Sequence, residues 1–276
     1  MPQFASLPPD KRSAIFRRHL VQDSPIIVEE GDDDFDMNPN IASGALLRQQ
    51  YFMGDDDVGQ QLVKEACEIY YGENQFNVRI DWLCEFMSDS LGDYKTKIPI
   101  APLVRGAITV VADLHDGCDN HHSYELRGDE VEDDKEDEHS IHYRHGTGKQ
   151  ARWTQKLLQN LFLFNNAEQV TLVLHGRGLL DGSDLATHQT MKDISFVVRR
   201  LIEHFGDRFT IKKRLDRGSY PTRSLRSYWD APTDFARRNV RRGEATFEQV
   251  MQVEMEEWTR VFPPTIGSWM DREILA

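Results

Sequence analysis

The sequence predicts an α/β protein with a mostly parallel sheet built from βα units and a helical cover at its C-terminal end. Five runs of strand length, either β-branched or alternating apolar with polar, are spread along the 276 residues, and amphipathic helical patterns separate them. Such alternation favours parallel strands joined by right-handed crossovers. An apolar content of 39% with 29% charged residues is that of a folded chain with some polar inserts.

The N-terminal part begins with a predicted helix over 11–20. Two prolines precede this pattern, and proline is tolerated at the first turn of a helix because its missing N–H would have no partner there. The expected apolar stripe of the helix joins Ala14, Ile15 and Leu20. Residues 25–28 then form the first expected strand.

A further helix is expected to begin near Val58 and to end at Gly72, because a left-handed C-cap favours glycine. Phe76, Val78 and Ile80 alternate with polar residues, which is the two-residue period of a half-buried strand. The other helices expected in this half cover 44–52 and 82–87.

The C-terminal half continues the alternation. Nearly continuous apolar runs at 107–114 and 169–174 predict buried strands, and a run with one polar face predicts a strand at 209–215. Helical spacing of apolar residues predicts helices between these strands at 153–162 and 191–205, the second ended by the glycine that follows it.

Two helices are expected to close the chain. The first covers 232–242 and ends at Gly243. Thr246 and Gln249 have the spacing of a capping box, in which each side chain binds the backbone N–H of the other. The wide apolar stripe that starts at Phe247 is expected to pack against the chain's own sheet.

Charge is distributed unevenly along this acidic chain. The net charge is −13, yet residues 199–242 contain 13 Lys/Arg and 5 Asp/Glu. Because cations beside Tyr220, Tyr228 and Trp229 suit single-stranded nucleic acid, one hypothesis is a nucleic-acid-associated protein. The favoured alternative is that these charges lie on solvated faces and pair with acidic loops of the same chain, since an acidic chain attracts nucleic acid poorly. The candidate basic patch is Lys212, Lys213, Arg214, Arg217, Arg223 and Arg226.

A polar insert at about 116–150 combines histidines and Cys118 with the acidic run 129–138. Imidazole and thiolate suit zinc, so a further hypothesis is a metal-dependent enzyme that uses this insert. The low complexity of the acidic run favours a disordered, solvated loop instead. The sequence therefore predicts no metal site and no cofactor.

Catalytic motifs fail on inspection of the sequence. The stretch from Gly146 to Lys149 ends like a phosphate loop, but Gln150 stands where a serine or threonine would bind magnesium. The Gly-x-Ser-x-Gly elbow of many hydrolases is absent from the sequence. We therefore predict no catalytic residues and no enzymatic activity.

Two groups of residues carry a resemblance to a known family. Leu7, Pro8 and Pro9, followed by Ile15 and Leu20, resemble the start of an F-box-like motif. The segments 46–48, 65–66 and 71–76, the last reading Tyr-Gly-Glu-Asn-Gln-Phe, are similar to the pattern of filamentous-fungal F-box-like proteins of unknown function. This resemblance implies F-box-like N-terminal helices, a Skp-type adaptor as partner and a remainder that selects a substrate. The adaptor-binding residues it implies are Leu7, Pro8, Ile15 and Leu20.

These observations favour a non-enzymatic protein-interaction module, whose narrower form is a divergent F-box-type substrate receptor. The expected division is an F-box-like segment with the first strands at 1–92 and an α/β region at 93–276, either as two units or as one compact unit. Three irregularly spaced cysteines predict no disulfide framework, and the first residues lack the features of a signal peptide. The expected partner is a protein rather than nucleic acid or a membrane, in the cytoplasm or nucleus.

Overall fold

The computed structural model describes residues 2–28, 56–87, 99–114, 154–215 and 222–261. Within these ranges the chain forms one six-stranded sheet whose strands follow chain order from β1 to β6. The first five are parallel, and β6 is antiparallel to β5, which confirms the predicted α/β class. The strands are β1 (Ile26–Val28), β2 (Phe76–Arg79), β3 (Ala107–Asp113), β4 (Gln169–His175), β5 (Phe209–Arg214) and β6 (Arg223–Ser224).

The helices lie between and beyond these strands at nearly the predicted positions. The predicted helix over 44–52 and the insert at 116–150 lie outside the described residues. Among the described helices, none is long and apolar enough to cross a membrane. The α-helices are α1 (Pro2–Ala5), α2 (Pro9–Leu20), α4 (Asp57–Glu73), α5 (Leu83–Met87), a helix over 154–159, α7 (Leu185–Phe205), α8 (Asp234–Arg242) and α9 (Phe247–Val261). Short 3-10 turns are η1 (Ile80–Trp82), η2 (Ala101–Leu103), η3 (Asn160–Leu163), η4 (Gly206–Arg208) and η5 (Arg226–Trp229).

The helices cover one face of the sheet. Because each parallel strand lies beside the one before it, right-handed crossovers carry the described connecting helices to the same side. The strand side chains on that side, such as Val78, Val110 and Leu172, join one hydrophobic core with the helices. Val111 and Val173, which alternate with these residues, are outside that core cluster although they are only 4% and 5% exposed. They therefore belong to the opposite face of the sheet.

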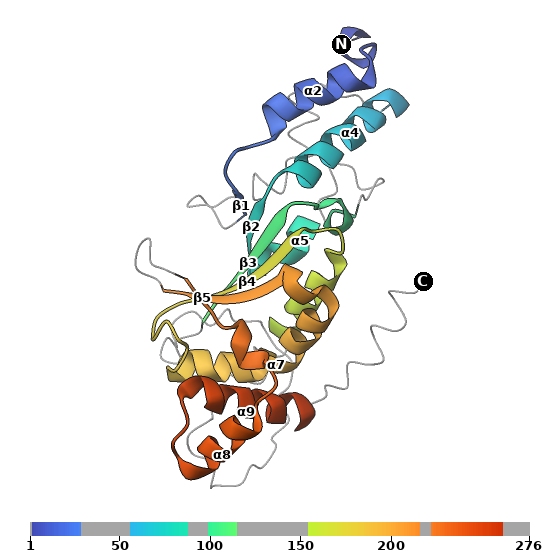
Figure 1. Cartoon of the computed structure of the whole chain (residues 1–276). Coiled ribbons are helices and arrows are strands. Elements are labelled where there is room, and N and C mark those ends of the chain that lie inside the picture. Colours follow the sequence, from blue (N-terminus) through green and yellow to red (C-terminus); the bar gives the residue numbers. More distant parts are fainter. Residues whose placement is uncertain (1, 29–55, 88–98, 115–153, 216–221, 262–276) are drawn as a thin grey trace, which may run out of the picture.

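The sheet lies between two pairs of helices, with α2 and α4 at one end of the molecule and α8 and α9 at the other (Figure 1). In the first pair, α2 runs parallel to α4. The Arg12 guanidinium donates to both carboxylate oxygens of Glu65 at 2.8 and 2.7 Å and also to the Leu7 carbonyl at 2.7 Å. This bidentate contact fixes the register of α2 on α4.

Asn74 ties the ends of both helices to the start of the sheet. The side chain is only 1% exposed. Its Nδ2 donates to the carbonyls of Leu20 and Tyr70 at 2.9 and 2.8 Å, and its Oδ1 accepts from the backbone N–H of Gln22 at 2.8 Å. A buried amide with all these bonds satisfied holds the chain in place before β1 and after α4.

Two local predictions at this end are wrong. Gly72 is not a left-handed cap: it lies inside α4, which runs on to Glu73. Asn74 is the capping residue, and its amide binds the Tyr70 carbonyl that the helix end leaves without a partner. In α2 the inward face is formed by Phe16 and Leu20, whereas Ala14 is exposed.

The end of the first C-terminal helix and the start of the second are as predicted, but the packing of the second differs. Gly243 ends α8 with a φ of 73°. The N–H of Thr246 donates to Gln249 Oε1 at 3.2 Å and the N–H of Gln249 donates to Thr246 Oγ1 at 3.3 Å, so the capping box is confirmed. Met251 and Met255 are fully buried, but the prediction that this stripe packs against the sheet is wrong: α9 packs mainly on α7, α8 and η5, and α7 and η5 in turn contact β5.

The boundary expected between 92 and 93 falls between two paired strands. β2 and β3 pair in parallel from Phe76 with Ile108 to Arg79 with Val111. The described parts of both segments therefore contribute to the same sheet, and β1 and β2 of the first segment continue it without a break.

Candidate functional site

The face of the sheet opposite the helices presents mostly polar side chains in rows that cross the strands. The parallel register aligns Arg79 with Val111, then with Val173 and Lys212. The next row toward the carboxyl ends of the strands aligns Asp113, His175 and Arg214. We call this surface the polar face. It consists of Asn77, Arg79, Thr109, Val111, Asp113, Thr171, Val173, His175, Thr210, Lys212 and Arg214.

A hydrogen-bonded chain crosses three strands of the polar face. Arg79 Nη2 donates to Asp113 Oδ2, and His175 Nδ1 lies 3.0 Å from Asp113 Oδ1. Arg79 also approaches the Asp81 carboxylate at 3.8 Å. The side chains of Arg79, Asp113 and His175 are 25–36% exposed, so this hydrogen-bonded group is accessible to solvent but partly shielded. Two carboxylates therefore balance Arg79, whereas the β5 side of the face is positive.

Sequence reasoning assigned no function to Arg79 or Asp113, although the sequence contains a pattern that marks both. Each is the last residue of its strand, and each is on the polar side of a two-residue alternation. The carboxyl ends of neighbouring parallel strands meet at one edge of the sheet, so such residues come together. His175 ends β4 in the same way.

The structure divides the candidate basic patch between the two faces of the sheet. Lys212 and Arg214 lie half-buried on the polar face, but Lys213 points into the core and is 0% exposed. Arg223 is exposed on β6 opposite Lys213, and Arg226 is half-buried in η5. Arg217 lies outside the described residues. The prediction of one continuous patch is therefore wrong at Lys213, because a strand sends neighbouring side chains to opposite faces.

Lys213 is held by the beginning of α7. Its Nζ donates to Asp184 Oδ2 at 2.5 Å and to the hydroxyl of Thr187. Asp184 is the N-cap of α7: its Oδ1 accepts from the Thr187 N–H at 2.9 Å, and its Oδ2 accepts from the Leu179 N–H at 2.9 Å. Gly178, with a φ of 101°, leaves room for this carboxylate, because a Cβ there would lie 2.3 Å from Asp184 Cγ.

These contacts also set the protonation state of Asp184. Burial raises the pKa of this carboxyl, but the hydrogen bonds from Lys213, Thr187 and Leu179 outweigh that effect and leave the pKa below its usual value. The carboxylate is therefore charged at neutral pH and balances the buried ammonium. This pair is part of the scaffold beneath the site.

The aromatic residues expected to stack on nucleic acid are not available for that purpose. Tyr228 and Trp229 are each 1% exposed. The Tyr228 hydroxyl donates to the Asp181 carbonyl at 2.8 Å, and Trp229 Nε1 donates to the Ser195 carbonyl at 3.0 Å. Both belong to the core, so their expected role as stacking surfaces is wrong, and Tyr220 lies outside the described residues.

The residues expected to bind an adaptor differ in their accessibility. Pro8 is exposed, Leu7 and Ile15 are half-buried, and Leu20 is 8% exposed within the core. After α2 the chain enters the sheet as β1. Leu7, Pro8 and Ile15 therefore keep some accessible surface, whereas Leu20 packs inward.

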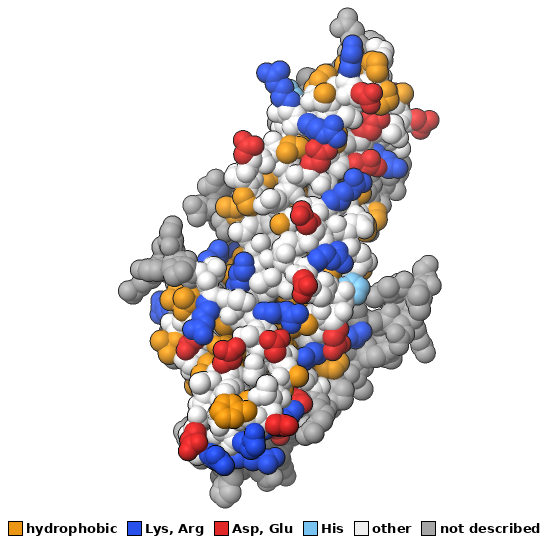
Figure 2. Space-filling view, viewed as in Figure 1, with side chains coloured by type: hydrophobic (Ala, Val, Ile, Leu, Met, Phe, Trp, Pro, Cys, Tyr) orange, Lys and Arg blue, Asp and Glu red, His pale blue; other side chains and the backbone are white. Residues whose placement is uncertain are grey.

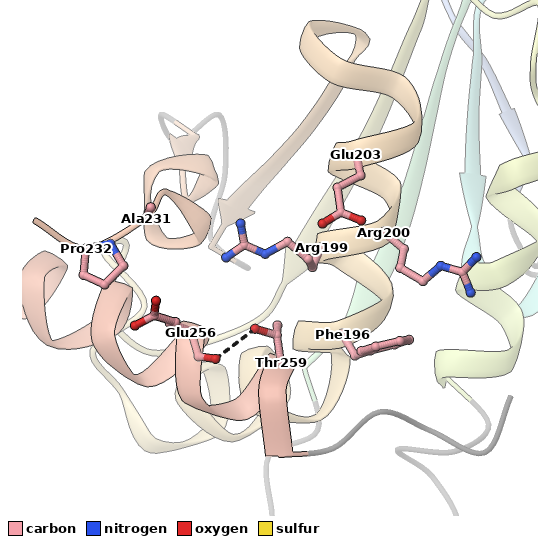
Figure 3. Close-up of a pocket in the computed structure, with 8 residues that line it drawn as sticks. All are labelled: Phe196, Arg199, Arg200, Glu203, Ala231, Pro232, Glu256 and Thr259. Carbon is pink, nitrogen blue, oxygen red and sulfur yellow. Dashed lines mark hydrogen bonds between the residues drawn. The ribbon is translucent and has the colours of Figure 1, made fainter. Parts of the chain in front are cut away.

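A shallow groove of about 510 Å³ lies between α7, the turn at Ala231 and Pro232, and α9 (Figure 3). Its charged and hydroxyl groups are largely engaged in structural contacts. The Thr259 hydroxyl donates to the Met255 carbonyl at 2.7 Å, and Glu256 receives two bonds from Arg237. The groove therefore has the chemistry of a helix–helix junction.

Metal and thiol chemistry find little support in the described parts of the chain. These parts contain no group of three or more His, Cys, Asp or Glu side chains placed to hold a metal ion. Cys67 is buried in the core, and burial raises the pKa of the Cys84 thiol. The histidines of the insert lie outside the described residues.

Comparison with known proteins adds no relative: no family model, no curated protein and no solved structure matches this chain.

Proposed function

We propose that this chain is a non-enzymatic protein-interaction module that receives its partner on the polar face of the sheet. The strand order supports this location. Open α/β sheets bind small ligands in the crevice at a switch point, where the strand order reverses and helices change sides. This sheet runs from β1 to β6 in order, so its described part has no such point. Singly wound βα arrays present a broad face instead, as solenoid repeats do.

The observation that carries the proposal is the row Arg79–Val111–Val173–Lys212. It places charged side chains at the two ends and apolar side chains at the centre. The two valines are only 4% and 5% exposed, so the surface a partner can contact consists of the half-exposed charged and polar side chains around them. Polar side chains of this kind form the rim of a protein–protein interface. On the side of the molecule seen in Figure 2, acidic and basic side chains are interspersed and hydrophobic ones are scattered. That side therefore shows no comparable candidate for a binding surface.

The narrower form of the proposal is a divergent F-box-type substrate receptor. Its support is the resemblance of the segment that starts at Leu7 together with the separation of two surfaces. The outer side of α2 would meet a Skp-type adaptor, and the polar face would meet a substrate. A receptor needs two such independent surfaces because it must hold both proteins at once.

The polar face is tested by affinity purification of the tagged full chain from its native cells, followed by quantitative mass spectrometry. We expect the double variant K212E/R214E to lose most of the proteins enriched by the unchanged chain. The matched control K64E/R238E makes the same change in net charge at two exposed positions away from this face. Loss of the same proteins in both variants, or in neither, would contradict the proposal.

The adaptor surface needs a separate variant. Deleting α2 would remove Phe16 and Leu20 from the core, so the change must be confined to the helix surface. We expect I15E, made at a half-buried position, to abolish co-purification of a Skp-type adaptor while retaining the proteins that depend on Lys212 and Arg214. Absence of any such adaptor from the unchanged chain's partners would leave the interaction module and refute its F-box-type form.

A further inference from the structure

Three cations of the polar face keep unused hydrogen-bond donors. Lys212 and Arg214 form no ion pair or side-chain hydrogen bond with any part of the chain that the structure describes. Arg79 uses Nη2 for Asp113, and its Nε and Nη1 groups have no partner among the described residues. An anionic group could therefore bind at each of these three positions.

The spacing of these cations restricts what can bind them together. Arg79 and Lys212 are at the two ends of one row and are separated by three strand spacings, or about 14 Å. An extended peptide rises about 3.3 Å per residue, so its side chains i and i+4 lie on one side and about 13 Å apart. The side chain at i+2 then lies between the two cations, above Val111 and Val173, which are buried and offer no group that could pair with a charge.

We propose that the partner of this module presents an extended acidic segment that lies across β2 to β5 on the polar face. Acidic residues at positions i and i+4 contact Arg79 and Lys212, and the residue at i+2 is uncharged because no cation faces it there. Arg214 lies one row nearer the carboxyl ends of the strands and binds a further carboxylate on the β5 side. This inference rests on the proposed function and adds the chemistry of the partner.

A nucleic acid fits this surface less well than an acidic peptide. Its evenly spaced phosphates would meet the carboxylates of Asp81 and Asp113 beside Arg79, and like charges repel. Of the aromatic rings considered for stacking on bases, the two that the structure describes, Tyr228 and Trp229, are buried. A peptide can place its carboxylates only where the cations are.

One segment of this chain has the same spacing and is a competing occupant. Asp129, Val131 and Asp133 provide acidic, apolar and acidic residues at i, i+2 and i+4. The described chain leaves β3 at Leu114, at the carboxyl edge that carries Asp113. Fourteen residues lie between Leu114 and Asp129, and a chain of that length can span up to about 50 Å. The experiment must therefore distinguish this segment from a partner.

The test measures fluorescence anisotropy of a labelled peptide that contains Glu-Ser-Leu-Ser-Glu, titrated with the full chain at low salt. The control peptide has the same composition in the order Glu-Glu-Leu-Ser-Ser. We expect the first peptide to bind about tenfold more tightly than the control. We also expect K212E/R214E to weaken its binding by about tenfold or more and K64E/R238E to leave it within about twofold.

Each other outcome has a defined meaning. Equal binding of the two peptides would overturn the proposed spacing. Binding that appears only in the D129N/D133N variant would assign the face to the chain's own acidic segment, and tighter binding of a single-stranded oligonucleotide at the same residues would assign it to nucleic acid. Failure of the peptide, while cellular partners still depend on Lys212 and Arg214, would refute the acidic segment and leave the proposed function standing.

Discussion

Strand β5 presents Lys212 and Arg214 on one face of the sheet and Lys213 on the other, and the two faces treat the same kind of charge in opposite ways. On the helix-covered face, Lys213 is fully buried and bound by Asp184 and Thr187. On the polar face, Lys212 and Arg214 are half-buried and have no ion pair with a described residue. The same kind of positive charge therefore stabilises the fold on one face of the sheet and is available to a binding partner on the other.

The difference follows from the cost of removing charge from water. A buried ammonium without a partner loses several kcal/mol of hydration, so it is tolerated only with a close anion and satisfied hydrogen bonds. A half-exposed ammonium keeps most of its hydration and contributes about 0–1 kcal/mol to folding. Charge on the polar face can therefore be selected for binding with little effect on stability.

The largest effect on stability that tests the contrast between the two faces is expected at Asp184. We expect D184A to lower the free energy of unfolding by about 3–5 kcal/mol, because it leaves the Lys213 charge buried without its anion and removes the cap of α7. Urea denaturation monitored by circular dichroism measures the change. The control D207A alters an exposed aspartate in η4 and should change stability by no more than about 0.5 kcal/mol.

A second substitution separates the buried charge from the cap. In the D184A background, K213M removes the uncompensated ammonium while keeping an apolar side chain of similar length. We expect the double variant to regain part of the lost stability, so that the two changes are not additive. A D184A variant as stable as D207A would show that Lys213 is solvated in some other way and would remove the contrast between the two faces.

The same strand shows how far sequence reasoning could go. The alternation of Phe209 and Ile211 with polar neighbours predicted a strand with one polar face, and the structure confirms the strand. Extended through the strand, that two-residue period puts Lys213 on the side of Ile211. The position of Lys213 was therefore predictable, but its partner was not, because Asp184 is 29 residues away and reaches it only through the packing of α7.

Helix ends show a similar limit. Thr246 and Gln249 were predicted correctly because a capping box is a contact within one turn. The end of α4 was predicted incorrectly because Asn74 caps it while also binding Leu20 and Gln22, more than 50 residues away in the chain. Local patterns specify local contacts, whereas the tertiary partners of a polar side chain determine its role.

For the same reason, only part of the polar face could be predicted from the sequence. Alternation predicted a polar side for the strands that begin at Phe76 and Phe209, whereas the nearly continuous apolar runs at 107–114 and 169–174 were predicted as buried strands. The row that joins Arg79 to Lys212 depends on the order and register of four strands. These are set by crossover connections and by packing against the helices, and no short motif records them.

A smaller effect that tests the same contrast is the acid sensitivity of the buried Lys213–Asp184 pair. The pKa of Asp184 is lower in the folded chain than in the unfolded one, despite the opposing effect of burial, because Lys213, Thr187 and Leu179 donate to the carboxylate. Its contribution to stability is therefore present above the unfolded pKa of about 3.9 and is lost as pH falls through the lower folded value. We expect wild-type stability to fall more steeply below about pH 4 than that of D184N, measured by urea titration at a series of pH values. Parallel curves for the two proteins would contradict this assignment.

The smallest expected effect on stability lies on the polar face. We expect K212A and R214A each to change the free energy of unfolding by no more than about 0.5 kcal/mol, because neither side chain has an ion pair with a described residue to lose. The same variants should weaken binding of the acidic peptide severalfold in the anisotropy assay. A small change in stability with a large change in binding is the result that separates a surface kept for a partner from one kept for folding. If either variant instead lost as much stability as D184A, the cations of the polar face would be part of the scaffold, and the two faces of the sheet would not differ in the way the contacts of β5 indicate.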